Sequence, residues 1–174
     1  MKYQPKKSIW RRIKQGACGL VALLASGCGA VSVRTGGMTY DNETADWTNG
    51  VAATFRLPKS DVSLGVTVDH TLHEIEDYDI NVDNLEIAGE VACELYGNPK
   101  VGGVELVFGY GINAAMATLP DGTDANSKTE FTRAGARGTL GIGRYKLLGG
   151  ADYIRFLGES NPKEGLRFYL GAEF

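Results

Sequence analysis

Apolar and polar side chains alternate with a period of two residues along segment after segment of the chain beyond residue 30. Across 62–69 every second residue is a valine or leucine, and small or polar residues stand between them. Across 104–113 the same alternation recurs with larger apolar side chains. Successive side chains of a β-strand point to opposite faces, so this pattern is typical of strands with one apolar face. No convincing helical period competes with it, and the sequence therefore predicts an all-β protein.

Eight alternating segments follow one another, and most are near the roughly 9–11 residues that a tilted strand needs to cross a bilayer. The predicted strands cover 30–40, 47–57, 61–72, 84–96, 102–117, 129–144, 146–157 and 165–174. Connections after the second, fourth and sixth segments are very short. The other connections are longer and cover 41–46, 73–83, 118–128 and 158–164. Short turns on one side and long loops on the other are typical of outer-membrane barrels.

A sheet exposed to lipid must leave no backbone group unpaired, so it has to close on itself. Eight strands enclose an interior that side chains can fill. The sequence thus predicts an eight-stranded antiparallel up-and-down transmembrane β-barrel, formed as a single domain by residues 28–174. Its alternate apolar residues would face lipid, and the residues between them would face the lumen.

Charged side chains of both signs fall on the predicted lumen face. A buried charge without a partner costs several kcal/mol, so we expect Arg–Glu pairs across the lumen rather than an open pore. If the barrel were instead soluble, the same charges would form an ordinary solvated surface. The residues of the expected network are Arg56, Glu86, Glu90, Glu94, Glu105, Arg133, Arg137, Arg155, Arg167 and Glu173.

Residues 1–27 have the features of a secretory signal peptide. They contain six basic residues and no acidic residue, and their apolar run at 16–25 is too short to cross a membrane as a helix. The exit from this run, Leu24-Ala25-Ser26-Gly27-Cys28, resembles a bacterial lipobox. That resemblance implies that Cys28 becomes the lipidated first residue of the mature chain. Ordinary signal-peptidase cleavage between residues 25 and 30 is the alternative.

Charge and cysteine content exclude several other classes of protein. After the first 27 residues the chain holds 12 basic and 21 acidic residues, which argues against nucleic-acid binding. Three cysteines and two histidines show no spacing of metal ligands, and we predict neither a metal nor a cofactor. Cys18 would leave with the signal. A Cys28–Cys93 disulfide could form only if Cys28 is not lipidated.

The last ten residues strengthen the barrel interpretation, because they end on an aromatic residue with apolar residues at alternate positions: Leu166, Phe168, Leu170, Ala172 and Phe174. With the eight segments, this resembles the small eight-stranded outer-membrane barrels, which include the membrane domain of outer membrane protein A and compact adhesin-like proteins. The resemblance covers residues 30–174. It implies localisation in the outer membrane of a Gram-negative bacterium and recognition of these five residues by the barrel-assembly machinery. A lipoprotein-type signal departs from the usual pattern.

The same resemblance implies contact with outer-membrane lipid and lipopolysaccharide, and an extracellular partner for the four longer loops. Some barrels of this family are lipid A acyltransferases or deacylases, and only His70 and His73 could act here as near-neutral bases. In the deacylase pattern a serine stands two residues after the histidine, whereas Leu72 occupies that position after His70. We therefore predict no catalytic residue and a structural or surface-interaction role. The alternatives are a lipid-anchored soluble lipocalin-like barrel around a small hydrophobic ligand and a lipid A-modifying enzyme.

Overall fold

A computed structural model describes residues 29–40, 46–75, 80–98, 101–119, 122–158 and 163–174. These residues form eight strands: β1 (Gly29–Tyr40), β2 (Asp46–Arg56), β3 (Val62–Ile75), β4 (Ile80–Asn98), β5 (Gly102–Thr118), β6 (Asp124–Ile142), β7 (Tyr145–Phe156) and β8 (Glu164–Glu173). Within the described ranges, no helix is long and apolar enough to cross a membrane.

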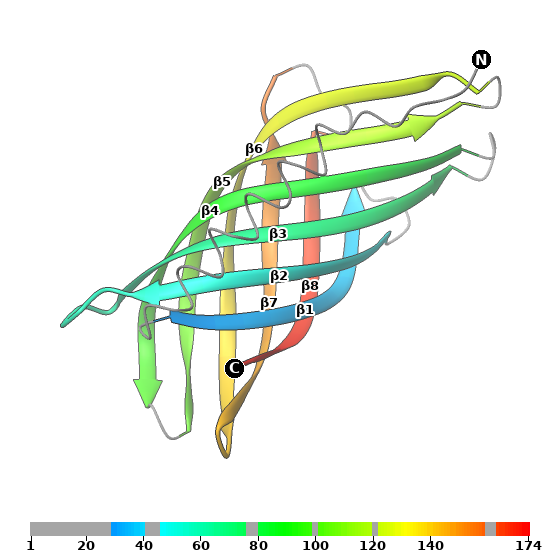
Figure 1. Ribbon diagram of the computed structural model, residues 1–174. Helices are drawn as coiled ribbons and strands as arrows, with labels where there is room; N and C mark the ends of the chain where they lie inside the picture. The colour runs from blue at the N-terminus through cyan, green and yellow to red at the C-terminus, as the bar shows by residue number, and fades with distance from the viewer. Residues whose placement is uncertain (1–28, 41–45, 76–79, 99–100, 120–121, 159–162) are drawn as a thin grey trace.

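Every strand pairs antiparallel with its neighbours in sequence, and β1 also pairs with β8, so the sheet is a closed barrel (Figure 1). Closure leaves no strand edge with unpaired backbone groups, which is what a sheet in lipid requires. The predicted fold class, an eight-stranded antiparallel up-and-down barrel, is confirmed.

The strand registers fix the stagger of the barrel. A line that follows paired residues from Tyr40 to Gly165 on β8, and onward through β7 to β2, returns to β1 at Ala30. The offset of ten residues (40 minus 30) is the shear of the barrel. Eight strands with this stagger tilt by about 35–45° and enclose an interior only wide enough for side chains.

The strands on one side of the barrel are longer than the sequence predicts. The ladder between β3 and β4 continues to Ile75 and Ile80, and the ladder between β5 and β6 continues to Thr118 and Asp124. Most of the predicted loops 73–83 and 118–128 are therefore strand, and the predicted contrast between long and short connections is wrong there. These segments were predicted as loops because they are polar. Strands that extend beyond the lipid pair through their backbones and do not need an apolar face.

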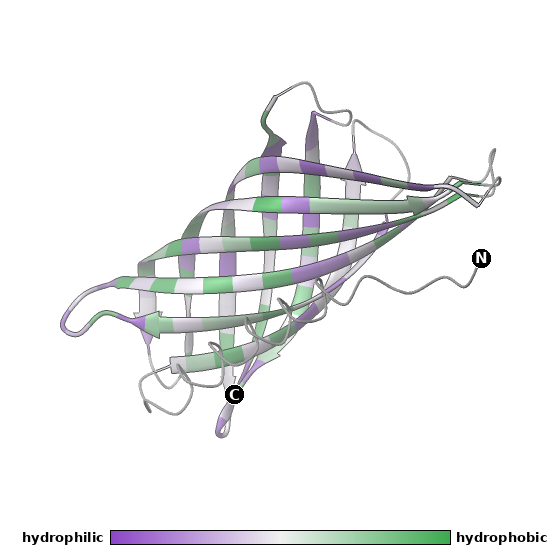
Figure 2. Cartoon of the chain, turned by 45° about the horizontal axis from the view of Figure 1, so that its top comes forward, coloured by the Kyte–Doolittle hydropathy of each residue, from purple (hydrophilic) through white to green (hydrophobic). Residues whose placement is uncertain are grey.

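Apolar side chains form the outer wall over most of the barrel, and buried charged side chains point into its lumen. Leu64 and Leu170 are 45% and 71% exposed, whereas Glu90 and Arg137 are each 4% exposed. Figure 2 shows the hydrophobic and hydrophilic residues alternating along the strands. A lipocalin-like barrel would have the reverse orientation, with its apolar face around a ligand. The structure contradicts that alternative.

Candidate functional site

Nine charged side chains converge inside the barrel from seven of its strands and form one connected set of ion pairs. Each stands at an inward position of its strand, and the residues before and after it in the strand point outward. We call this set the lumen network. It consists of Arg34, Asp69, Glu86, Glu90, Glu105, Arg133, Arg137, Asp152 and Arg167. All but Glu105 are buried.

Arg167 is the centre of the network and has no solvent exposure. Its Nη1 donates to Asp69 Oδ2 and Glu86 Oε2, each at 3.0 Å. Its Nη2 donates to Asp152 Oδ2 at 2.8 Å. One guanidinium thus joins carboxylates from β3, β4 and β7. A planar guanidinium with five donors suits this role, because it can satisfy several oxygens at fixed angles.

Asp69 joins the centre to two further arginines. Arg34 Nε donates to Asp69 Oδ1 at 2.7 Å, and Arg34 Nη2 also contacts Oδ2 of the same carboxylate. Arg133 Nη1 lies 3.7 Å from Asp69 Oδ2. Three arginines therefore surround one buried carboxylate, which offsets the cost of removing it from water.

The remaining links run toward the end of the barrel where β1 begins and β8 ends. Arg133 Nη2 pairs with Glu90 Oε2 at 2.5 Å, and Arg137 Nη1 pairs with Glu90 Oε1 at 3.2 Å. Arg137 Nη2 then reaches Glu105 Oε2 at 2.7 Å. The side chain of Glu105 is 19% exposed, so the network becomes accessible to solvent at this edge.

Inward-facing glycines leave the space that the network occupies. A Cβ atom at Gly50 would lie 1.9 Å from Asp69 Oδ1, and one at Gly135 would lie 2.3 Å from Asp152 Oδ1. Side chains at these positions would displace the carboxylates. Glycine in the middle of a strand is otherwise unfavourable, so its presence here is explained by the crowded lumen.

An apolar cluster lies between the lumen network and the end of the barrel that carries the β3–β4 and β5–β6 hairpins, which we call the outer end. Its buried members are Met38, Ala88, Phe131, Ile154 and Phe156. Tyr40 packs against it, with its ring centroid 6.1 Å from that of Phe156. Hydrophobic periodicity placed the large apolar residues on the outer wall and did not predict this cluster.

A polar cavity of about 350 Å³ lies at the opposite end, below the network. Two further ion pairs line it. Arg56 Nη1 lies 2.6 Å from Glu94 Oε2, and Lys146 Nζ lies 2.9 Å from Glu173 Oε1. The side chain of Arg56 is 51% exposed, so this cavity is a solvated vestibule.

The structure gathers most of the charged residues singled out in the sequence, in two groups. Glu86, Glu90, Glu105, Arg133, Arg137 and Arg167 belong to the lumen network, and Arg56, Glu94 and Glu173 line the vestibule. The placement of Arg155 in the lumen is wrong. It is exposed on the outer wall, because Ile154 and Phe156 take the inward positions of β7.

Four lumen charges were not predicted: Arg34, Asp69, Lys146 and Asp152. Asp69 could have been found, because it continues the inward phase of Gly65 and Thr67 in a segment with clear alternation. Asp152 stands in a segment rich in glycine, where the alternation does not fix the phase.

Other predicted site residues lie on the wall or outside the described residues. Leu166, Phe168, Leu170 and Phe174 are exposed on the outer face, and Ala172, at the same phase of β8, is half-buried. Cys28 lies outside the described residues. Cys93 is a free cysteine. No group of three or more His, Cys, Asp or Glu side chains in the described ranges could hold a metal ion.

Both histidines contact carboxylates. His70 Nε2 lies 3.1 Å from Asp83 Oδ1 on the outer face, and His73 Nδ1 lies 2.7 Å from Asp46 Oδ1. In the described part of the chain, neither histidine hydrogen-bonds a serine, threonine or cysteine side chain. An activated nucleophile requires such a pair, so these contacts provide none.

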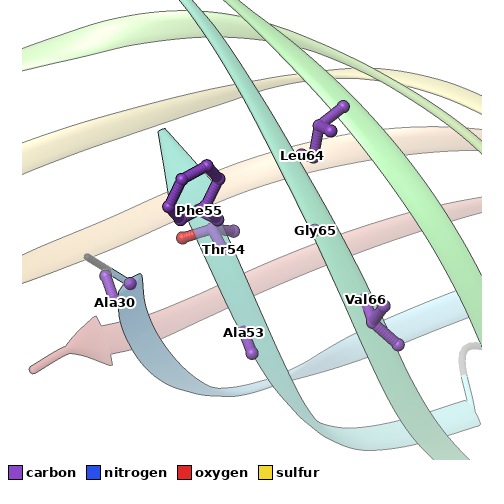
Figure 3. Close-up of a pocket in the computed structure, with 8 residues that line it drawn as sticks. Ala30, Ala53, Thr54, Phe55, Leu64, Gly65 and Val66 are labelled. Atoms are coloured by element: carbon purple, nitrogen blue, oxygen red, sulfur yellow. The ribbon is translucent and has the colours of Figure 1, made fainter. Parts of the chain in front are cut away.

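A small apolar pocket of about 200 Å³ lies in the wall of β1–β3, near the end of the barrel where β1 begins (Figure 3). Phe55, Leu64 and Val66 are among the side chains that line it, together with Gly29, the first described residue. Apolar side chains in this position suit the acyl chains of the membrane.

A closed antiparallel barrel with an apolar wall and a charged interior is the architecture of the small outer-membrane proteins. Solved structures with this fold include Neisserial surface protein A (10% identity, TM-score 0.58, 83% of this chain and 94% of that one). They also include a major outer membrane protein from Thermus thermophilus (13% identity, TM-score 0.61, 84% and 98%). The outer membrane enzyme PagL is a third (17% identity, TM-score 0.51, 83% and 98%).

These similarities confirm the predicted resemblance to small eight-stranded outer-membrane barrels. The predicted localisation, the bacterial outer membrane, is that of the Thermus thermophilus protein and of PagL. No protein-family model and no curated protein matches the sequence. Since the neighbours include both a surface protein and an enzyme, the fold by itself does not decide between these roles.

Proposed function

We propose that this protein is an outer-membrane barrel with a structural or surface-interaction role, in which a closed lumen stiffens an anchor for outward-facing hairpins. The observation that carries the proposal is the lumen network. It joins seven strands through buried ion pairs in a barrel whose outer wall is apolar.

The network and the apolar cluster above it favour a closed lumen. Conduction requires a continuous path of water, whereas the four arginines of the network are buried and held by carboxylates. The cluster around Phe131 adds a water-excluding layer on the outer side. We infer that the vestibule ends blindly at Arg137 and Glu105.

The extended hairpins favour a surface role. The paired ends of β5 and β6 carry exposed polar residues, including Ser127 and Lys128, and they continue beyond the ends of the shorter strands. A partner or the sugars of lipopolysaccharide would meet these hairpins first. Binding and catalytic residues are commonly found on such outer segments because a rigid scaffold holds them.

Accessible cysteines at the two ends of the barrel test this topology. Ser127→Cys on the β5–β6 hairpin should react with a membrane-impermeant maleimide on intact cells. Arg144→Cys, in the turn between β6 and β7, should react only after the outer membrane is opened. The unsubstituted chain measures the background from its own cysteines. Labelling of Arg144→Cys on intact cells, or release of the protein by carbonate, would contradict the proposal.

A lipid anchor at Cys28 is a separate proposal, supported by the lipobox resemblance and by the position of Gly29 beside the apolar wall pocket. An acyl chain attached at Cys28 would enter the inner leaflet beside β1–β3. The barrel alone would still hold the protein in the membrane.

A further inference from the structure

A row of polar side chains crosses the outer wall of β1, β2 and β3. Thr35 is paired in register with Asn49, and Asn49 with His70, and all three side chains are exposed. The neighbouring rows are apolar over β8, β1, β2 and β3, and on β4 the outer one continues with the exposed Asp83, whose Oδ1 lies 3.1 Å from His70 Nε2. Toward the outer end the row is Phe168, Gly37, Trp47 and Leu72, and toward the vestibule it is Ala172, Val33, Val51 and Val68. Over β8, β1, β2 and β3 the polar row therefore has an apolar row on each side.

The hydrogen bonds of this row are incomplete. Thr35 Oγ1 donates to Asn49 Oδ1 at 2.8 Å. Among the described residues, nothing accepts a hydrogen bond from Asn49 Nδ2. In water such an amide would be solvated, whereas acyl chains offer no acceptor, and an unpaired amide in hydrocarbon is costly.

The wall is hollowed at the same place. A shallow groove of about 730 Å³ extends over β7, β8, β1, β2 and β3, and Thr35, Asn49 and His70 line it together with Val33, Val51, Leu147 and Leu170. The groove thus combines apolar contact area with a central amide that has free donors. This combination suits a protein surface more than it suits acyl chains.

We propose that this groove is where two copies of the chain associate within the membrane. Two identical barrels inserted in the same direction are related by an axis along the membrane normal, so each row meets its copy at the same depth. An amide both donates and accepts, so Asn49 is complementary to the same residue in a second copy. Polar side chains stabilise association between membrane segments in this way. The inference rests on the proposed membrane insertion.

Cross-linking in native membranes tests the interface. Asn49→Cys is combined with Cys93→Ala, and the full chain is oxidised in isolated outer membranes. Ala134→Cys, exposed on β6 four strands away, is the matched control, and Cys93→Ala alone gives the background from the remaining cysteines. We expect a dimer band for Asn49→Cys that exceeds both controls. The heat-dependent gel mobility of the same samples reports barrel insertion independently.

A second variant distinguishes a second copy of the chain from lipopolysaccharide as the occupant of the groove. Asn49→Leu should weaken dimerisation, measured by energy transfer between labelled copies in liposomes, by about three- to tenfold. Equal cross-linking at Ala134 and Asn49, or none at Asn49 in a correctly inserted barrel, would overturn the inference. It would also be overturned if the protein is monomeric and Asn49→Leu instead loses bound lipopolysaccharide. Failure of insertion in the gel assay would refute the proposed function itself.

Discussion

Replacing Arg167 with methionine should remove much of the stability of the barrel. Among the described residues, Arg167 is the one cation within ion-pair distance of Glu86 and of Asp152, whereas Asp69 keeps Arg34 and Arg133. The substitution therefore leaves two buried carboxylates without a counter-charge. Breaking a buried ion pair by removing one partner costs about 3–5 kcal/mol. We expect the free energy of unfolding to fall by at least this amount.

The vestibule offers a matched control. Arg56→Met removes a guanidinium of the same size from a pair whose arginine side chain is 51% exposed. Exposed pairs contribute about 0–1 kcal/mol, so this variant should remain close to the wild type. The combination of Arg167→Met with Glu86→Gln should be less unstable than Arg167→Met alone, because it removes one of the uncompensated charges.

Urea titration of the barrel in lipid vesicles, followed by the gel shift between folded and unfolded forms, measures these differences. The urea midpoint of Arg167→Met should fall well below that of Arg56→Met with little change in slope. If Arg167→Met and the wild type unfold within about 1 kcal/mol of each other, the buried ion pairs do not hold the lumen together as described.

Three further predictions concern the pairing of β1 with β8, the lipid anchor and barrel assembly. A Cβ atom at Gly36 would lie 1.8 Å from the Phe168 carbonyl oxygen, whereas nothing lies within 4 Å of one at Gly89. Gly36→Val should therefore abolish the compact gel form, and Gly89→Val should keep it. Cys28→Ser should abolish incorporation of labelled palmitate while the heat-dependent gel shift remains; equal labelling of both chains would exclude the anchor. Phe174→Ala should lower the amount of barrel recovered in the outer membrane at unchanged synthesis, and full recovery would exclude its role in assembly.

Hydrophobic periodicity predicted the strands and the wall because both depend on a local property. Residues two apart share a face of any strand, so Leu64, Val66 and Leu170 were correctly assigned to the outside. Closure of the sheet was predicted because lipid offers no hydrogen-bond partner, so the edge strands of an eight-stranded sheet in a membrane must pair with each other. The stagger of the barrel was not predicted, because it depends on the register of every strand pair.

The lumen was harder to predict because its contacts join residues far apart in the sequence. Arg167 and Asp69 are separated by 98 residues. Alternation predicts that each side chain faces inward, but it does not predict which charged side chains form ion pairs. Arg155 was misplaced because β7 reverses the usual pattern near its end, where Ile154 and Phe156 turn inward and Tyr153 and Arg155 turn outward. In that strand the identity of the residues does not reveal the phase.

The most direct test of the account is to measure which side chains touch lipid. Nuclear Overhauser contacts between methyl-labelled protein and micelle acyl chains can be assigned residue by residue. Strong contacts are expected from Leu64, Val66 and Leu170 and none from Ile154, which is fully buried beside Phe131. Acyl contacts at Ile154 together with their absence at Leu64 and Leu170 would mean that the barrel is inside out, and the account would be wrong.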